Sequence, residues 1–323
     1  MDLKDISQPI QPHLDAFPKV FRQALRSNVG LVELVTKYLV RQKGKRVRPI
    51  LVLLSAEACG GVTEKSYRGA TLVEILHTAT LVHDDVVDDA DTRRGLPSIN
   101  AVWKNKIAVL MGDYLLSRGL LLSLEHGDVQ FLQITSTSVR RMSEGEIHQI
   151  QKSRKLDMDE ETYLKIIGDK TASLLSVCCE IGAASASVDP ELHRRLREYG
   201  ENVGMAFQIR DDVLDYVGRR SITGKPTGLD LNEKKLTLPL IHALREAPKS
   251  NGKEILAMIR NGGRKMKVRA VVDFVKSYGG LEYAGGKAEA FVARAKEQLE
   301  ILPSSPSKDA LIAFADFVIT REK

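Results

Sequence analysis

Apolar residues recur along most of the chain at three- and four-residue spacing, which is the period of an amphipathic α-helix, and no convincing strand-like alternation is present. Leu311, Phe314 and Val318 show this spacing and predict a helix docked on a core. At Asp189-Pro190 an N-cap residue and a first-turn proline predict a helix start. The pattern predicts helices over 15–26, 30–41, 48–59, 66–91, 99–124, 128–150, 159–187, 190–217, 236–246, 253–261, 267–278, 281–301 and 307–321.

The predicted fold class is therefore all-α. The chain has 323 residues and contains neither a low-complexity linker nor a fixed-period repeat, which favours one domain over 1–323. Hydrophobic residues make up 43% of the chain and aromatic residues only 5%, so aliphatic side chains must fill the core. The first residues lack a basic-then-apolar signal pattern, and no uninterrupted apolar run reaches the ~18 residues of a membrane span. We expect a soluble, cytoplasmic protein.

The charge balance is mildly basic, with 48 Lys and Arg against 42 Asp and Glu. Basic residues are not interleaved with aromatic ones and no nucleic-acid-binding motif is present, so nucleic acid is not expected as a partner. A small anionic substrate is equally compatible with this mild excess of positive charge. Cys59, Cys178 and Cys179 are odd in number and lack Cys-x-x-Cys spacing, which indicates free thiols and no zinc site.

The stretch from His83 to Asp91 places five carboxylates at the end of an apolar helical run. At about 100° per residue, Asp84 and Asp88 lie within roughly 40° of each other, and Asp91 and His77 fall near the same stripe. Carboxylates so placed repel one another unless a cation bridges them, and Mg2+ prefers oxygen ligands together with waters and substrate phosphates. For one such cluster in isolation, a solvated acidic helix end is the favoured alternative.

A second cluster repeats the Asp-Asp-x-x-Asp pattern at Asp211 to Asp215, again inside an apolar helical run. Gly204, Gln208, Asp211 and Asp215 share one face of this helix. Chance explains two such clusters far less well than it explains one. If the two helices face each other, their carboxylates would form a cage for metal ions.

Basic residues stand next to these predicted helices. The segment 44–49, Gly-Lys-Arg-Val-Arg-Pro, precedes an apolar helix, and Pro49 suits its first turn. The dipole and free N–H groups of a helix N-terminus favour anions, so the segment predicts a diphosphate site, with a basic surface loop as the alternative. Arg93-Arg94-Gly95 follows the first acidic cluster, where guanidinium groups would take up phosphate charge that metals leave uncompensated.

Two other kinds of site find no support. The segment 218–225 resembles a P-loop, but five residues separate its glycines, Pro226 stands where Ser or Thr is required, and no strand precedes it. As a basic loop it would instead place Lys225, and later Lys234 or Lys235, over a bound diphosphate as a lid. Covalent catalysis is not expected, because no apposed Ser or Cys in a recognised pattern accompanies the candidate histidines His77, His83 and His148.

Together these motifs resemble the trans-type isoprenyl diphosphate synthases, whose two aspartate-rich motifs match Asp84 to Asp88 and Asp211 to Asp215. The resemblance covers nearly the whole chain, and the full set of motifs in this order is highly specific. The pattern is most similar to that of the bacterial octaprenyl diphosphate synthases, which make quinone side chains. The other matching segments are 44–49, His77, 93–95, 112–113, 144–146, 170–171, 207–208, 224–225, 230–231 and 237–240.

The resemblance implies a helical bundle of the isoprenoid synthase type with a central active-site cavity, a homodimer, and peripheral membrane contact for product release. It implies that isopentenyl diphosphate is held by Lys45, Arg48, His77 and Arg94. The allylic diphosphate, with farnesyl diphosphate as the expected primer, would be surrounded by Arg93, Lys170, Thr171, Gln208, Lys225 and Lys235. Mg2+ would tie this diphosphate to Asp84, Asp88 and Asp211, and the implied catalytic residues are these three aspartates with Lys170 and Gln208.

The sequence departs from the family pattern at three places. Gln42-Lys43 replaces the extra glycines often found before Gly44, Lys234 stands where the lid usually has glycine, and Asp89 makes the first cluster more acidic than usual. They affect the loops and not the expected chemistry. A terpene cyclase usually lacks the Lys45 and Arg48 site, and a non-catalytic subunit of a heteromeric synthase would have lost aspartates. Neither alternative fits this sequence.

The residues before the first motif bear on product length. Ala79 and Thr80, about one turn before Asp84, are small, and no aromatic residue precedes them back to Tyr67. Over ~12 residues at about 1.5 Å rise, this helix would line an apolar tunnel of roughly 18 Å. We expect an octaprenyl-class product, with a shorter-chain geranylgeranyl or farnesyl diphosphate synthase as the alternative. The side chains expected to line the tunnel below them are Leu76, Ile75, Val73 and Leu72.

Overall fold

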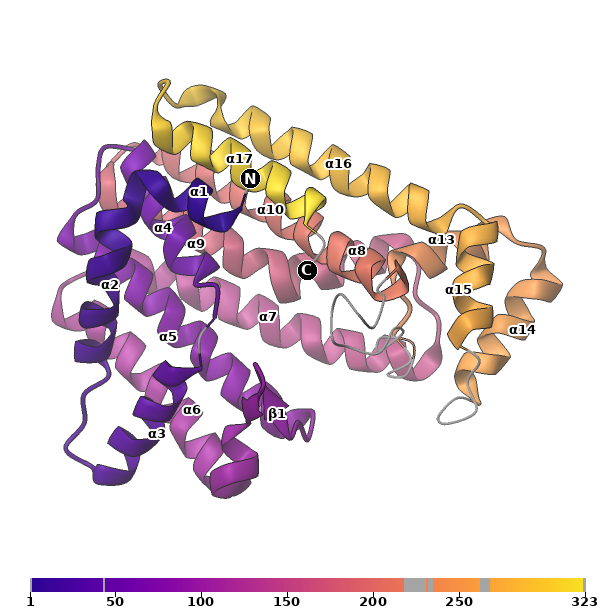
Figure 1. Ribbon diagram of the computed structural model, residues 1–323, viewed down its shortest axis with the longest axis horizontal. Helices are drawn as coiled ribbons and strands as arrows, with labels where there is room; N and C mark the ends of the chain where they lie inside the picture. The colour runs from indigo at the N-terminus through magenta and orange to yellow at the C-terminus, as the bar shows by residue number, and fades with distance from the viewer. Residues whose placement is uncertain (1, 43, 218–230, 232–234, 262–267, 322–323) are drawn as a thin grey trace.

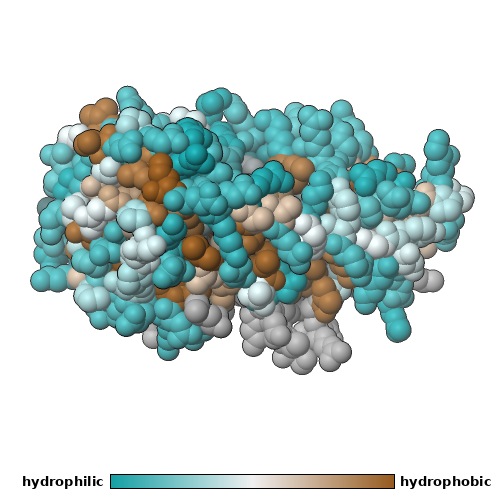
Figure 2. Space-filling view, turned by 90° about the horizontal axis from the view of Figure 1, so that it is seen from above, coloured by the Kyte–Doolittle hydropathy of each residue, from teal (hydrophilic) through white to brown (hydrophobic). Residues whose placement is uncertain are grey.

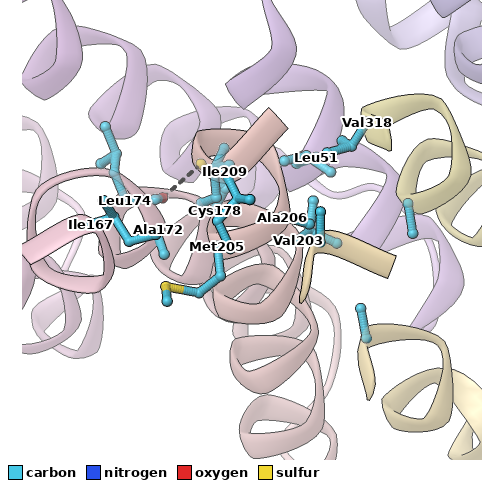
Figure 3. Packing of buried hydrophobic residues seen from close by; sticks show 14 of the residues in the cluster. Leu51, Ile167, Ala172, Leu174, Cys178, Val203, Met205, Ala206, Ile209 and Val318 are labelled. Carbon is cyan, nitrogen blue, oxygen red and sulfur yellow. Dashed lines mark hydrogen bonds between the residues drawn. The ribbon is translucent and has the colours of Figure 1, made fainter. Parts of the chain in front are cut away.

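Helix α9 (Ser173–Ala186) is the central element of the bundle, because twelve of its 14 residues are buried. Its small residues permit close packing on both sides. A Cβ at Gly182 would lie 2.4 Å from the carbonyl oxygen of Val52 in α4, and a Cβ at Gly200 of α10 would lie 2.5 Å from that of Leu175. Figure 3 shows this region, where Cys178 donates to the carbonyl oxygen of Leu174 within a cluster of aliphatic side chains.

Helices surround α9 in the computed structural model, which describes residues 2–42, 44–217, 231, 235–261 and 268–321 (Figure 1). The helices that precede α9 are α1 (Leu3–Ser7), α2 (Gln11–Ala24), α3 (Gly30–Arg41), α4 (Val47–Ala58), α5 (Glu64–Val87), α6 (Ile99–Glu125), α7 (Val129–Lys155) and α8 (Glu160–Ile167). Those that follow it are α10 (Pro190–Val217), α13 (Leu238–Glu246), α14 (Lys249–Arg260), α15 (Val268–Ser277), α16 (Gly280–Gln298) and α17 (Pro306–Thr320). Short helical turns are η1 (Gln8–Ile10), η2 (Gly168–Ala172), which is π-helical, and η3 (Leu299–Ile301). The predicted all-α class is confirmed.

Local sequence explains where several helices begin. Thr63 and Ser66 form a capping box at the start of α5. Side chains of Ser98, Asp159 and Ser305 accept hydrogen bonds from backbone N–H groups at the starts of α6, α8 and α17. The sequence did not predict α1 and η1, which precede the first expected helix.

Helix α5 ends at Val87, earlier than the predicted residue 91. Asp89 adopts a left-handed conformation with φ 48°, and the N–H of Ala90 donates to the carbonyl oxygen of Asp85 at 2.9 Å. These two features form a Schellman-type helix end, in which Asp is a tolerated left-handed residue. Asp91 therefore lies beyond the helix, and its predicted place on the stripe of Asp84 is wrong.

A two-stranded hairpin follows, although the sequence predicted no strand. Strand β1 (Thr92–Arg93) pairs antiparallel with β2 (Leu96–Pro97). The two linking residues, Arg94 and Gly95, both have positive φ, 53° and 77°. This geometry is that of a two-residue type I′ hairpin turn, so Arg94 occupies a backbone conformation that is unfavourable for most side chains.

Helix α6 carries an apolar surface that the rest of the described chain leaves uncovered. By length and composition alone it is apolar enough to cross a membrane, and only 33% of its most apolar window is buried. By contrast, the face over α16 and α17, seen from above in Figure 2, is mostly hydrophilic with short apolar strips. The large apolar residues exposed on α6 are Val102, Val109, Leu110, Leu120, Leu121 and Leu124.

Candidate active site

The aspartates of the first acidic cluster divide into two kinds. Asp85 is buried, and its Oδ1 accepts a hydrogen bond at 2.8 Å from Nε of Arg93, which is anchored in the hairpin. Asp84 and Asp88 are exposed and lie one turn apart at the end of α5. The ion pair between Asp85 and Arg93 fixes the hairpin to the end of α5. Asp84 and Asp88, by contrast, present exposed carboxylates to a ligand. In this structure Arg93, predicted to surround the allylic diphosphate, is the ion-pair partner of Asp85.

Asp84 belongs to a charged group that spans three elements. Partial removal from water raises the pKa of Asp84; the nearby ammonium of Lys170 offsets part of this rise, and the carboxylates of Glu146 and Asp88 add to it. Lys170 of η2 is itself ion-paired with Glu146 of α7. The structure therefore brings Lys170, whose role is implied by the family resemblance, close to the first acidic cluster.

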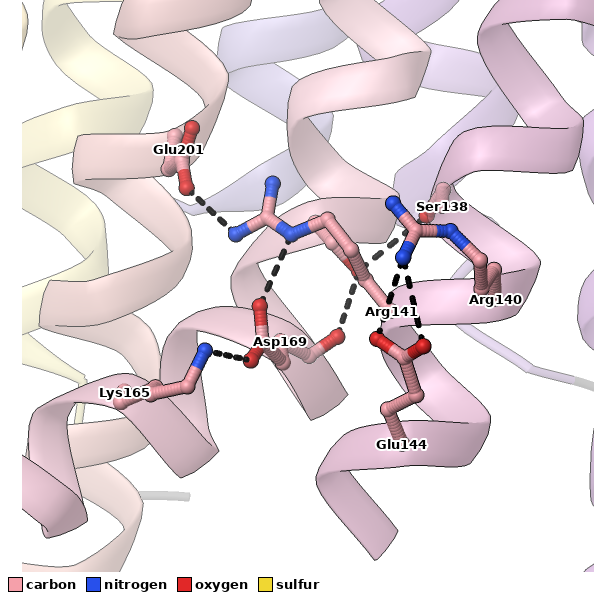
Figure 4. A network of polar contacts seen from close by, with 8 residues as sticks. Ser138, Arg140, Arg141, Glu144, Lys165, Asp169 and Glu201 are labelled. Carbon is pink, nitrogen blue, oxygen red and sulfur yellow. Dashed lines mark hydrogen bonds and ion pairs between the residues drawn. The ribbon is translucent and has the colours of Figure 1, made fainter.

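Gly145 and a partly exposed ionic network position η2 beside α7. A Cβ at Gly145 would lie 3.0 Å from Cβ of Asp169, so the glycine permits close approach of the two elements. Arg141 of α7 donates to Asp169 and to Glu201 of α10, each at 2.8 Å, and Lys165 pairs with Asp169 at 3.2 Å (Figure 4). Asp169 directly precedes Lys170 and Thr171, so these contacts hold both candidate ligands in place.

The second acidic cluster also contains aspartates with different surroundings. Asp212 is buried and accepts hydrogen bonds from the hydroxyl of Tyr163 at 2.6 Å and from Nε2 of Gln208 at 2.8 Å. Gln208 in turn accepts from the hydroxyl of Thr171 at 2.9 Å. Asp211 is half-exposed and pairs with Arg321 at 2.7 Å. The hydrogen bonds fix the orientation of Gln208 between η2 and the second cluster.

Most of the residues predicted to surround an allylic diphosphate line one pocket of about 90 Å3. Lys170, Thr171, Gln208 and Lys235 all contribute to its wall, together with Asp212. The sequence separates these residues by up to 65 positions, and the fold brings them together. Lys225, and the P-loop-like segment that contains it, lie outside the described residues.

The residues predicted to hold isopentenyl diphosphate are only partly gathered. Burial, with the nearby guanidinium groups of Arg48, Arg94 and Arg93, holds the pKa of His77 well below its usual value. Burial also lowers the pKa of Arg48, whose Nε is buried without a hydrogen-bond partner among the described residues. Lys45 is exposed and lines a neighbouring cleft beside α1 and α2. The site thus contains a neutral imidazole and strong cations near the start of α4.

The backbone around Gly44 explains the position of Arg94. A Cβ at Gly44 would lie 2.5 Å from Nη1 of Arg94, so only glycine permits the guanidinium to approach this closely without a shift. Nη1 also donates to the carbonyl oxygen of Gln42 at 3.2 Å. The predicted diphosphate site at the start of α4 and the hairpin are therefore joined through Arg94.

Glu74 is a site residue that the sequence did not single out. It lines a cavity with Arg46, Arg93 and Arg94. Burial raises the pKa of Glu74, and the guanidinium groups of Arg48, Arg94 and Arg46 oppose that rise. Glu74 is the only acidic residue between positions 70 and 82 and lies one turn before His77, which is the signal that would have identified it.

The described residues do not form the carboxylate cage expected from the sequence. Within the described ranges, no three His, Cys, Asp or Glu side chains converge to hold a metal ion by themselves. The exposed carboxylates of Asp84, Asp88 and the half-exposed Asp211 are nevertheless hard oxygen donors. This donor set fits a Mg2+ ion that takes its remaining ligands from water and substrate phosphates.

The cysteines take no part in these sites. Cys178 and Cys179 are buried, Cys59 is half-buried, and all three are free thiols, as predicted. Burial raises the pKa of Cys59 and of Cys179 to about 12, so neither is a thiolate nucleophile at neutral pH.

The sequence and structure match known enzymes over their full length. The Polyprenyl synthetase family matches residues 30–275. An all-trans-nonaprenyl-diphosphate synthase (geranyl-diphosphate specific) of Rhodobacter capsulatus is 39% identical over 319 residues, 98% of each chain. Octaprenyl diphosphate synthase of Escherichia coli is 34% identical over 323 residues, 100% of each chain.

Solved structures agree with this assignment. The crystal structure of a polyprenyl synthase from Caulobacter crescentus, complexed with calcium and isoprenyl diphosphate, has a TM-score of 0.91 at 32% identity and covers 100% of this chain and 98% of that one. Similar enzymes are also named for shorter products, among them a geranylgeranyl diphosphate synthase of Saccharolobus solfataricus that is 33% identical over 93% of each chain. The chain belongs to the Polyprenyl synthetase family and is a trans-prenyl diphosphate synthase.

Proposed function

We propose that the chain, as one catalytic domain over 1–323, is a Mg2+-dependent long-chain polyprenyl diphosphate synthase. It adds isopentenyl diphosphate repeatedly to an allylic diphosphate, with farnesyl diphosphate as primer, and makes an octaprenyl-class product for quinone side chains. The observation that carries the proposal is the pocket formed by Lys170, Thr171, Gln208 and Lys235. Lys170 of this pocket also lies close enough to Asp84 of the first acidic cluster to offset part of the rise in the pKa of that carboxyl. Lys170 thus links the pocket proposed to bind the diphosphate to the carboxylates proposed to bind the metal.

The chemistry follows from charge. The allylic C–O bond breaks when the negative charge on the departing diphosphate is stabilised, and preorganised cations and hydrogen-bond donors supply this stabilisation. Lys170 and Lys235 provide the positive charge, while Thr171 and Gln208 are held by their mutual hydrogen bond. Mg2+ bound by Asp84, Asp88 and Asp211 would act as a Lewis acid on the same phosphate oxygens.

The C–O electron pair leaves with diphosphate, and an allylic cation remains. The double bond of isopentenyl diphosphate attacks this cation and forms the new C–C bond. The positive charge moves to the more substituted carbon of the former double bond. A proton from the carbon next to it then passes to the departed diphosphate, which forms a new double bond and gives a longer allylic diphosphate. Apolar side chains of the same pocket, from Met158, Ile166, Ile167 and Leu236, would limit the access of water to the cation.

The second substrate would bind at the start of α4. Free N–H groups at a helix N-terminus and the guanidinium groups of Arg48 and Arg94 both favour a diphosphate. His77 stays neutral because burial and the neighbouring cations disfavour its protonation. It can therefore donate one hydrogen bond without adding charge.

The geometry of α5 gives different surroundings to Ala79 and Thr80, which the sequence analysis placed in the same tunnel. Thr80 lies four residues before Asp84, within roughly 40° of it, and Val73 and His77 continue the same stripe. Ala79 faces elsewhere, because it is fully buried in a cluster with Leu115 of α6. Three of the four expected tunnel residues, Leu72, Ile75 and Leu76, pack near Gly119 of α6 instead of following this stripe.

The side chains before the first aspartate cluster bear on product length. Thr80, one turn before Asp84, has a small and only partly buried side chain, which leaves room for a growing tail and supports a long product. Similar enzymes carry the names nonaprenyl, octaprenyl and geranylgeranyl diphosphate synthase, so a shorter-chain synthase is the alternative. A non-catalytic subunit is a weaker alternative, because both aspartate clusters are complete, although one relative is named heptaprenyl diphosphate synthase component 2.

We also propose a homodimer through α6. Stable interfaces bury about 800 Å2 per partner and have an apolar centre. The exposed leucines of α6 provide such a centre, and Leu110 and Leu121 fall within roughly 20° of each other on the helix.

Replacing either Asp84 or Asp211 by Asn should lower kcat about 10²- to 10³-fold, because each change removes a charged ligand beside the departing diphosphate. Incorporation of radiolabelled isopentenyl diphosphate measures the effect. Asp89→Asn is the matched control, since Asn retains the left-handed turn, and it should stay near wild-type activity. Full activity in excess EDTA, or near-wild-type turnover of Asp84→Asn, would contradict the metal mechanism.

The two diphosphate sites should respond to different substitutions. Arg48→Ala should raise the KM for isopentenyl diphosphate by about one to two decades, since a charge-assisted phosphate contact contributes roughly 1.5–3 kcal/mol. Lys170→Ala should instead affect the allylic substrate. Initial rates with each substrate varied in turn separate the two effects, and equal rises for both substrates in the Arg48 variant would show that this pocket is wrongly assigned.

Thr80→Tyr should shorten the product to about the farnesyl or geranylgeranyl class and leave the first condensation intact, because the ring would stand below Asp84 on the same stripe. Ala79→Tyr should mainly lower Tm, since overpacking a filled core costs about 1–3 kcal/mol. Chromatography of dephosphorylated products and thermal unfolding distinguish the two variants. Unchanged product length in Thr80→Tyr would show that the tail takes another path.

The combined change Leu110→Glu and Leu121→Glu should convert a dimer to a monomer, because it places charges in the centre of the apolar surface. Sedimentation equilibrium measures the mass. Val188→Glu, at a residue that is 96% exposed between α9 and α10, serves as the control and should remain dimeric. A wild-type protein that sediments as a monomer would disprove the homodimer.

A further inference from the structure

Arg321 makes an unusually complete set of contacts for an arginine just beyond a helix. It follows α17, and its side chain is only 8% exposed. The guanidinium lies over the ring of Phe207, with 3.7 Å from Cζ to the ring centroid. Such a cation over an aromatic face is attracted by the ring as well as packed against it. The stacking fixes the plane of the guanidinium against α10.

Hydrogen bonds then direct this guanidinium to the second acidic cluster. Nη2 of Arg321 donates to the carbonyl oxygen of Phe207 at 3.0 Å and to Oδ1 of Asp211 at 2.7 Å. In the reverse direction, Nε and Nη2 of Arg210 donate to the main-chain oxygen of Arg321 at 3.3 and 3.1 Å. Main chain and side chain of Arg321 are therefore both tied to one turn of α10.

We propose that Arg321 is a positioning residue for Asp211, holding this carboxylate in the orientation in which it binds the divalent metal of the allylic diphosphate site. The inference rests on the proposed function, because it assigns Asp211 as a metal ligand. Outer-shell partners of metal-binding carboxylates typically contribute a factor of about 10 to 100 in metal affinity.

The positive charge of Arg321 beside Asp211 also repels a metal ion, which opposes the effect of orientation. Asp211 is 43% exposed, so solvent screens that repulsion. Orientation does not depend on screening. Without Arg321, Asp211 would lose the 2.7 Å contact that fixes the direction of its Oδ1. Orientation therefore outweighs repulsion, and loss of Arg321 weakens metal binding.

Binding of Mn2+ in the presence of inorganic diphosphate tests the inference without requiring turnover. The EPR signal of free Mn2+ gives the dissociation constant. Arg321→Met retains contact with the Phe207 ring but removes the charged fork, and it should weaken Mn2+ binding about 10- to 100-fold. Arg321→Lys, which keeps the charge, should recover part of the affinity. The Mg2+ concentration needed for half-maximal activity should rise in the same order.

Lys296→Ala is the control for a purely structural effect. Lys296 of α16 pairs with Asp316 of α17, so its loss loosens the docking of α17 without touching Asp211. This variant should lower Tm and leave the Mn2+ dissociation constant unchanged. Equal Mn2+ affinity in Arg321→Met and wild type, equal weakening in Lys296→Ala, or tighter binding in Arg321→Met would each overturn the positioning role.

The outcomes also separate this inference from the proposed function. A wild-type chain that binds no Mn2+ with diphosphate would overturn both. Mn2+ binding that weakens in Arg321→Met, in a wild-type protein that makes only short products, would support the positioning role and contradict the proposed product length.

Discussion

The absence of a side chain at Gly204 determines how closely α10 approaches η2. A Cβ at this position would lie 2.4 Å from Cα of Ala172, a distance that real Cβ atoms do not reach. Gln208 lies one turn further along α10 and meets the hydroxyl of Thr171, the residue before Ala172. A wider helix separation would break this contact and move the second acidic cluster away from Lys170. Backbone packing, more than any single ion pair, therefore places the two halves of the site.

Three carboxylates of the site are paired with cations before any substrate is present. Asp85 is paired with Arg93, Glu146 with Lys170, and Asp211 with Arg321. This arrangement limits the repulsion that clustered carboxylates would otherwise create. It also holds each cation close to the position where phosphate charge is expected.

The sequence predicted the helices and the two aspartate clusters, because hydrophobic period and motif spacing are local properties. Ligands such as Lys170 and Thr171 are expected only from the resemblance to the family, since nothing in their local sequence marks them. The sequence predicted the wrong end for α5, since the left-handed conformation of Asp89 is one conformation among several open to an aspartate. It assigned Ala79 and Thr80 to the same tunnel, although adjacent helical residues differ by about 100° in direction. It missed Glu74 and Arg321, whose importance comes from neighbours distant in the chain.

The common stripe of Val73, His77, Thr80 and Asp84 on α5 has a consequence for how such enzymes diversify. One inserted or deleted residue between positions 73 and 84 would rotate every earlier side chain by about 100° relative to the aspartates. The residues proposed to face the tail would then turn toward α6, and those packed against α6 would take their place. In this chain a substitution on the stripe can change the proposed tail path without moving the aspartates, whereas an insertion cannot.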